Sequence, residues 1–172
     1  MGGFRMYQIG DWVVYGIHGV CRVIGTEKQL VNRKRTLYLV LEPLSQSESR
    51  FYLPAENPTA LAKLKPVLTK DQLMELLSSA DVRQDIWIPE ENLRKLRYRE
   101  LIAAGDRVSL MNMVTTLYRY KDAQTAAGRK FHQSDENFLR DAERLLASEF
   151  ALVMELTQEQ AKTYLRTQLI CE

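Results

Sequence analysis

The 172-residue sequence contains few cysteines, prolines and glycines: two, five and eight, respectively. Cys21 and Cys171 lie 150 positions apart. Two cysteines so placed exclude a disulfide framework and a CxxC zinc or redox motif. No apolar run approaches the ~18 residues that a membrane-spanning helix needs. The first residues also lack the apolar segment of a signal peptide, so we expect a cytoplasmic protein with no membrane association.

Large excess charge of either sign is also missing, since the formal net charge is only +2. The charges are nevertheless segregated along the chain. Residues 1–68 and 87–130 each carry +4, whereas residues 69–86 carry −2 and residues 131–172 carry −4. This pattern allows an anionic partner on selected faces only. Solvated helix faces of mixed sign would produce the same pattern.

The sequence lacks the convergent reactive groups of an enzyme. It has no HExxH helix, no phosphate-binding GxxxxGK[ST] loop and no GxGxxG after a strand. The two histidines, His18 and His132, fall in predicted loops of different domains. Cys21 alternates with apolar residues in a predicted strand and is expected to be a core residue. We therefore expect no catalytic activity, no cofactor, no metal and no small-molecule substrate.

Short strands dominate the first third of the chain. Each is four to six residues long, rich in β-branched and aromatic residues and bounded by glycine, proline or aspartate. The polar, basic segment from Glu27 to Arg35 suits an exposed hairpin tip. The predicted strands are residues 12–15, 20–24, 36–41 and 50–53. They predict a small, strongly bent barrel of the SH3 or Tudor type over residues 1–66.

Helical patterns follow, with the domain boundary between Pro58 and Thr69. The capping boxes at Thr69 and Thr157 predict the first and fifth helices. The intervening three are predicted from Pro89 to Ala104, from a cap at Asp106 to near Gly128, and from a cap at Ser134. The fold class is thus α+β, with a helical domain of about five helices over residues 67–172.

A basic helix preceded by a tryptophan is the strongest binding feature. Four cations lie on one predicted helix with Tyr98 among them; they are Arg94, Lys95, Arg97 and Arg99. Trp87, between Ile86 and Ile88, stands just before this helix. An apolar side chain beside cations can act as a wedge that unstacks a base step in the DNA minor groove. A core position is the alternative for Trp87, and it is the more usual place for a single tryptophan.

The sequence Ile9-Gly10-Asp11-x-Val13-Val14-Tyr15-x-x-His18-Gly19-Val20 resembles the opening of the CarD/CdnL family of bacterial transcription regulators. The resemblance continues through Tyr38–Leu41 and Leu53–Asn57. It returns at Gly105-Asp106 and over Leu145–Leu152, and so spans most of the chain from Met6 to about Leu169.

This resemblance implies a Tudor-like domain that docks on the β subunit of RNA polymerase. Two strand positions that are often basic in the family correspond to Gln29 and Tyr52, beside Lys28 and Arg50. The docking residues are therefore expected among Lys28, Gln29, Arg33, Arg35, Arg50 and Tyr52.

The resemblance further implies a helical domain that contacts promoter DNA at the upstream edge of the bubble and stabilises the open complex. Trp87, Arg94, Lys95, Arg97 and Arg99 are the expected DNA contacts. The family's wedge tryptophan corresponds, by ungapped spacing, to Glu91, and a basic position of the fourth helix corresponds to Glu136. A polymerase adaptor that touches no DNA is the alternative function.

Overall fold

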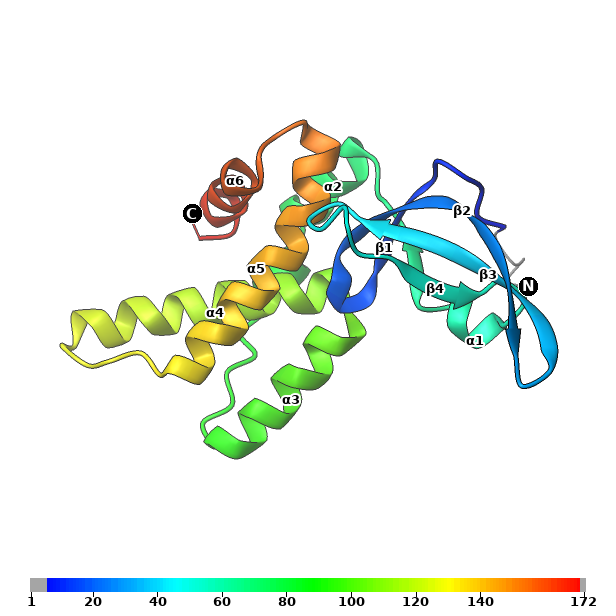
Figure 1. Ribbon diagram of the computed structural model, residues 1–172. Coiled ribbons are helices and arrows are strands. Elements are labelled where there is room, and N and C mark those ends of the chain that lie inside the picture. Colours follow the sequence, from blue (N-terminus) through cyan, green and yellow to red (C-terminus); the bar gives the residue numbers. More distant parts are fainter. Residues whose placement is uncertain (1–5, 171–172) are drawn as a thin grey trace. The chain divides into compact units, whose positions relative to one another are not determined.

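A computed structural model describes residues 6–170, so Cys171 lies outside the described part of the chain. The chain divides between Val67 and Leu68 into two compact units. The first contains the elements β1 (Trp12–Tyr15), β2 (Val20–Val31), β3 (Lys34–Pro43), β4 (Phe51–Pro54), α1 (Pro58–Leu61) and β5 (Leu64–Pro66). The second contains α2 (Lys70–Ser78), α3 (Glu91–Ala104), α4 (Arg107–Ala126), α5 (Gln133–Met154) and α6 (Gln158–Ile170) (Figure 1). This order confirms the α+β prediction.

The first unit is a five-stranded antiparallel sheet with the order β4-β3-β2-β1-β5. A bulge between Val23 and Gly25 interrupts the β2–β3 ladder; a bulge bends a strand and increases its twist. The core of this unit consists of Val13, Cys21, Val23, Leu39, Leu41, Leu53 and Leu64. Cys21 is fully buried, as predicted, and burial raises the pKa of its thiol to about 12.

Two short elements of the sheet unit, α1 and β5, were not predicted. The four-residue α1 and three-residue β5 are too short to show a periodicity; β5 exists because Leu64 to Pro66 pair with β1. The segment Glu27–Arg35 forms the exposed end of the β2–β3 hairpin, as predicted. Most of it belongs to the paired strands β2 and β3, and the turn is confined to Asn32 and Arg33.

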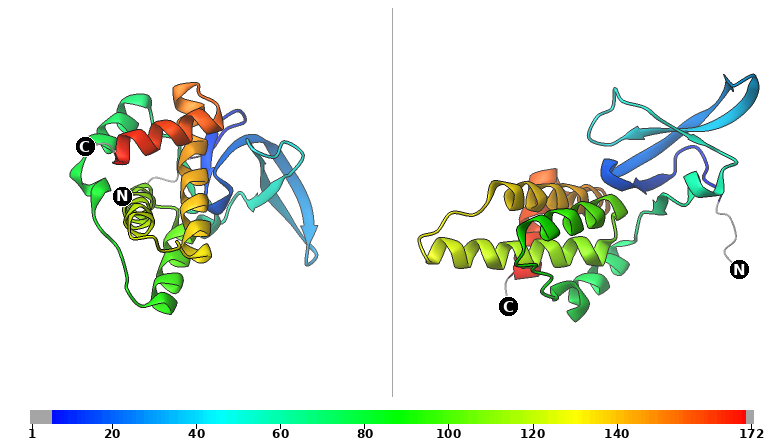
Figure 2. Two further views of the ribbon diagram at one scale, coloured as in Figure 1. Left: turned by 90° about the vertical axis from the view of Figure 1, so that its left-hand side faces the viewer. Right: turned by 90° about the horizontal axis from the view of Figure 1, so that it is seen from below.

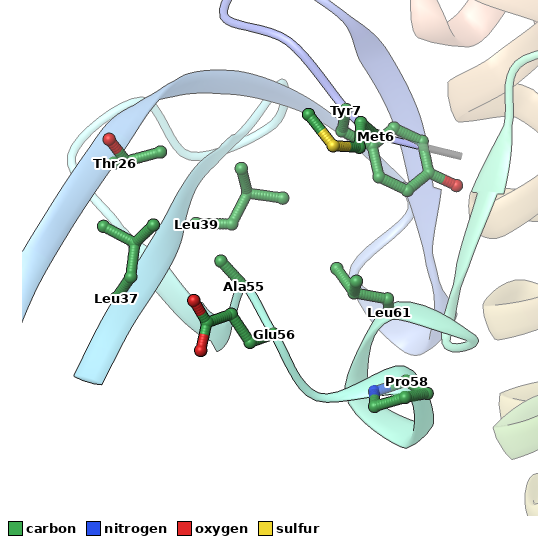
Figure 3. Close-up of a pocket in the computed structure, with 9 residues that line it drawn as sticks. All are labelled: Met6, Tyr7, Thr26, Leu37, Leu39, Ala55, Glu56, Pro58 and Leu61. Atoms are coloured by element: carbon green, nitrogen blue, oxygen red, sulfur yellow. The ribbon is translucent and has the colours of Figure 1, made fainter. Parts of the chain in front are cut away.

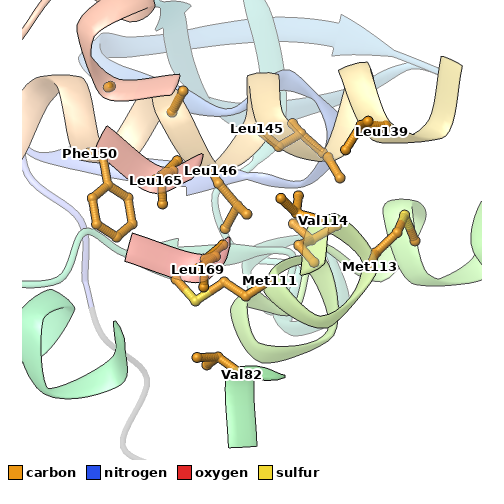
Figure 4. Close-up of a cluster of buried hydrophobic side chains, with 14 of the residues drawn as sticks. Val82, Met111, Met113, Val114, Leu139, Leu145, Leu146, Phe150, Leu165 and Leu169 are labelled. Atoms are coloured by element: carbon orange, nitrogen blue, oxygen red, sulfur yellow. The ribbon is translucent and has the colours of Figure 1, made fainter. Parts of the chain in front are cut away.

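The helical unit is built around α4 and α5. Nine consecutive residues of α4, Leu110 to Tyr118, are buried, so the middle of this helix is covered on all sides. Helix α5 packs against α3, α4 and α6, and α6 crosses it (Figure 2). Figure 4 shows the apolar side chains of α4, α5 and α6 converging on one core, with Val82 at its edge.

The helix termini agree with the predictions at most positions. Thr69 and Thr157 both form capping boxes, and Asp106 accepts a hydrogen bond from the Ser109 backbone N–H at 2.9 Å. Gly105 ends α3 with a φ of 65°, a conformation that glycine adopts without steric cost. Two predictions were wrong. Pro89 precedes the N-cap Glu90 and is not the first helical residue, and α5 begins at Gln133, before Ser134.

Candidate interaction surfaces

The extended segment before α3, which carries Trp87, is held by side chains of α4. The backbone N–H of Gln84 donates to Asn112 Oδ1 at 2.9 Å, and that of Ile86 donates to Thr116 Oγ1 at 3.0 Å. The Tyr98 hydroxyl donates to the Ile86 carbonyl at 3.3 Å. Buried polar side chains of α4 thus provide hydrogen-bond partners for a backbone segment without regular secondary structure, and they fix its path.

The Trp87 side chain is partly buried, which lies between the two alternatives considered for it. Its ring stacks on Tyr120 with centroids 3.6 Å apart and planes at 19°. The guanidinium carbon of Arg94 lies 4.2 Å from the same ring's centroid. Two groups this close cannot share one face of the ring, so Tyr120 and Arg94 cover opposite faces. Only the edge of the indole remains for a partner.

Arg94 is buried, and its place in the predicted DNA-contacting set is corrected by this finding. Only 2% of its surface is exposed. Its guanidinium donates to both carboxylate oxygens of Asp135 on α5, each at 3.0 Å, and to the Ile88 carbonyl at 2.8 Å. Burial lowers the pKa of Arg94, but the hydrogen bonds and charge of Asp135 outweigh it and leave that pKa raised. This guanidinium cannot reach a phosphate in this fold.

The other cations of α3 are accessible, but two of them are paired. Lys95 forms an ion pair with Glu91, and that hydrogen bond lowers the pKa of the Glu91 carboxyl. Arg97 pairs with Glu100 at 3.1 Å. Arg99 is exposed and makes no ion pair with the residues that the structure describes. The basic flank is therefore weaker than the sequence suggests.

Tyr98 is not part of this basic flank, because its side chain is fully buried. The exposed side of α3 carries two leucines, Leu93 and Leu96, that are 53% and 55% exposed. Sequence analysis did not identify them as surface residues. Their i, i+3 spacing is common on buried helix faces, so the sequence contains no signal that places them in solvent.

The candidate polymerase-docking residues lie on β2, β3 and β4 or directly beside these strands, and the structure divides them between two faces of the sheet. Alternation along the paired strands puts Gln29 and Tyr52 on one face, opposite the core. Arg50 pairs at 3.0 Å with Glu42, which lies on that face. Lys28 and Arg35 lie on the core-side face of the β2–β3 hairpin, and Arg33 occupies its turn.

No cluster of three metal-binding side chains occurs among residues 6–170. His18 packs on Phe51, with ring centroids 4.0 Å apart. Over the same residues, no helix is both long enough and apolar enough to span a bilayer.

Two family matches cover most of the chain. Residues 7–67 match the CarD-like/TRCF RID domain, which is Tudor-like, in agreement with the predicted fold of the sheet unit. Residues 72–166 match the CarD C-terminal domain. CarD-like families are non-enzymatic transcription factors. The chain belongs to the CarD-like family of RNA polymerase-interacting transcription regulators.

Proposed function

We propose that the sheet unit docks on the β subunit of bacterial RNA polymerase while the helical unit contacts promoter DNA at the upstream edge of the bubble. The contact with DNA would modulate the stability of the open complex, and the protein would act in the cytoplasm. The observation that carries the proposal is the presence of both CarD modules, in order, in one chain. The sheet unit has the free edge strand that such docking can use.

Strand β4 provides that free edge, because it pairs with β3 and stands last in the sheet. The backbone N–H of Ala55 donates to the Leu37 carbonyl at 2.8 Å. The backbone N–H and C=O groups of the alternate residues Leu53 and Phe51 therefore also point toward β3. The backbone of Tyr52 then points outward. An incoming strand of the polymerase could pair there, as in other sheet-extension complexes.

We expect Tyr52→Pro to weaken capture of core RNA polymerase by about tenfold, since proline removes the outward N–H and obstructs the incoming strand. Proline is tolerated on an edge strand where its nitrogen faces solvent, so the sheet itself should remain folded. Interferometry with immobilised polymerase measures the effect. The matched control, Tyr52→Val, changes the same side chain but keeps the N–H. Equal losses in the two variants would assign the contact to the tyrosine ring and contradict strand pairing.

For DNA, the accessible contacts are the Trp87 edge, Lys95, Arg97 and Arg99. Each phosphate that a cation neutralises makes binding fall by ~0.9 decade per decade of salt, so three contacts give a slope of about −2.7. We expect the salt dependence of the polymerase–promoter complex to steepen by up to this amount when the protein is added. Arg99→Gln should remove ~0.9 of it, whereas Arg140→Gln, an exposed cation on α5, should leave it unchanged.

The second candidate function is a protein-only adaptor on the polymerase. The ion pairs Lys95–Glu91 and Arg97–Glu100, together with the burial of Arg94, favour it, because they leave little free positive charge on α3. An adaptor would be retained on polymerase with no change in the salt slope and no effect of Arg99→Gln. The same titration therefore separates the two functions.

A further inference from the structure

The β2–β3 hairpin extends past the rest of its sheet as a two-stranded ribbon. The strands pair without interruption from Thr26–Leu39 out to Val31–Lys34, whereas β4 pairs with β3 only over Tyr38 to Leu41. The ribbon ends in a two-residue turn whose φ angles are 50° and 62°. Such a turn matches the right-handed twist of the two strands, so the ribbon has a defined shape out to its end.

An apolar pocket of about 490 Å³ opens at the base of this ribbon (Figure 3). Its walls come from the first described residues, from β2 and β3, and from the segment around α1. Glu56 is the only charged residue among the described residues that line it. The apolar lining includes Met6, Tyr7, Leu37, Leu39, Pro58 and Leu61. A pocket of this size holds one or two large apolar side chains of a partner, or one small ligand.

The ribbon continues the pocket wall outward on the same face. Directly opposed residues share a face and the faces alternate, so the Lys28–Leu37 and Leu30–Arg35 pairs follow the Thr26–Leu39 pair. Leu30 is 71% exposed. Lys28 and Arg35 are exposed and make no ion pair with any of residues 6–170. An apolar pocket is thus continuous with an exposed leucine and two unpaired cations.

We propose that this face, formed by the pocket and by Lys28, Leu30 and Arg35, binds an extended peptide segment of a partner protein that carries an apolar side chain and, on the same side of the chain, a carboxylate. The apolar side chain enters the pocket, and the carboxylate meets Lys28 and Arg35. Thr26 to Leu30 spans about 14 Å at ~3.4 Å per residue. The carboxylate therefore lies two or four residues from the apolar anchor, the spacings that keep both on one side of an extended chain.

The charge and the shape of the face both favour a peptide over other ligands. A small molecule that filled the pocket would leave Leu30 and the two cations uncovered. A nucleic acid would satisfy the cations but would offer no flexible apolar group to a pocket lined by leucine, methionine and tyrosine. The face is also opposite to the one that carries Gln29 and Tyr52, so a peptide bound here leaves strand pairing at β4 free, although it uses Lys28 and Arg35 from the set of expected docking residues.

Selection of random dodecapeptides displayed on phage against the full chain tests the proposal. The expected consensus is an apolar residue with Asp or Glu two or four positions away, always on the same side of it. Binding of the enriched peptide, synthesised with a fluorophore, is then measured by anisotropy. Lys28→Glu should weaken it roughly fivefold, through a lost exposed ion pair plus repulsion, and Leu37→Gln should weaken it at least as much. Lys34→Glu reverses a charge of the same ribbon on the opposite face and should have no effect.

Three results would overturn the proposal: no enriched peptide, a consensus without a carboxylate, or equal losses for Lys28→Glu and Lys34→Glu. Self-association that Leu37→Gln abolishes in sedimentation would instead assign the face to a second copy of the chain. Competition between the enriched peptide and core polymerase would make the face a part of the polymerase interface. Loss of polymerase capture in Tyr52→Pro without loss of peptide binding would show that the two surfaces are independent.

Discussion

Replacing Asp135 with alanine should lower the free energy of unfolding of the helical unit by about 3–5 kcal/mol, the usual cost of removing one partner from a buried ion pair. The carboxylate is fully buried and accepts two hydrogen bonds from Arg94, which is itself 2% exposed. Without Asp135, the guanidinium would retain its charge in a site with little access to water. Because domains are typically stable by only ~5–15 kcal/mol, this is a large loss.

Urea unfolding followed by helical circular dichroism measures the effect, and two variants serve as controls. Lys95→Ala breaks the exposed pair one residue further along α3 and should cost less than ~1 kcal/mol. The double substitution Arg94→Met with Asp135→Leu removes both charges together and should recover most of the lost stability. If Asp135→Ala cost no more than Lys95→Ala, the pair would not hold α3 against α5.

The features that sequence predicted correctly are local ones. The caps at Thr69, Gly105, Asp106 and Thr157 depend on residues within one helical turn, and the structure contains all of them. The strands β1 to β4 were also predicted, because each has a short apolar run with its own boundaries. Strand β5 was missed since only its pairing with β1 makes those three residues a strand.

The composition of the candidate DNA surface could not be predicted in the same way. Arg94, Lys95, Arg97 and Arg99 look equivalent along the sequence, because helical periodicity says which residues share a face but not which face is covered. The burial of Arg94 depends on Asp135, which is 41 positions away. The apolar residues of α3 are not confined to one side of the helix. The sequence pattern therefore does not show that Leu93 and Leu96 face outward while Tyr98 faces the core.

Trp87→Ala should reduce the stability of the helical unit by about 2–3 kcal/mol, less than the ~3–5 kcal/mol typical of a fully buried tryptophan. The substitution removes the stack on Tyr120 and uncovers the guanidinium of Arg94. The melting temperature should fall by roughly 10–20 °C. A wedge standing free of the fold would show almost no change in melting temperature, and the observed packing contradicts that simple form of the hypothesis.

A role in DNA binding then depends on the exposed indole edge, and Trp87→Phe isolates it. A phenyl ring can still lie between Tyr120 and Arg94. The melting temperature of this variant should therefore fall by less than half as much as that of Trp87→Ala. The variant lacks the second indole ring and so presents a shorter edge to a base step. Because unstacking a step costs a few kcal/mol, losing that contact should shorten the open-complex lifetime by about threefold or more.

Leu117→Ala, a core substitution on α4 with no surface change, controls for destabilisation alone. At temperatures where all three variants are folded, a lifetime shortened in both Trp87 variants and normal in Leu117→Ala supports contact through the edge. A normal lifetime in Trp87→Phe would mean that the tryptophan acts only in packing, and the protein-only adaptor would then be the better description of the helical unit.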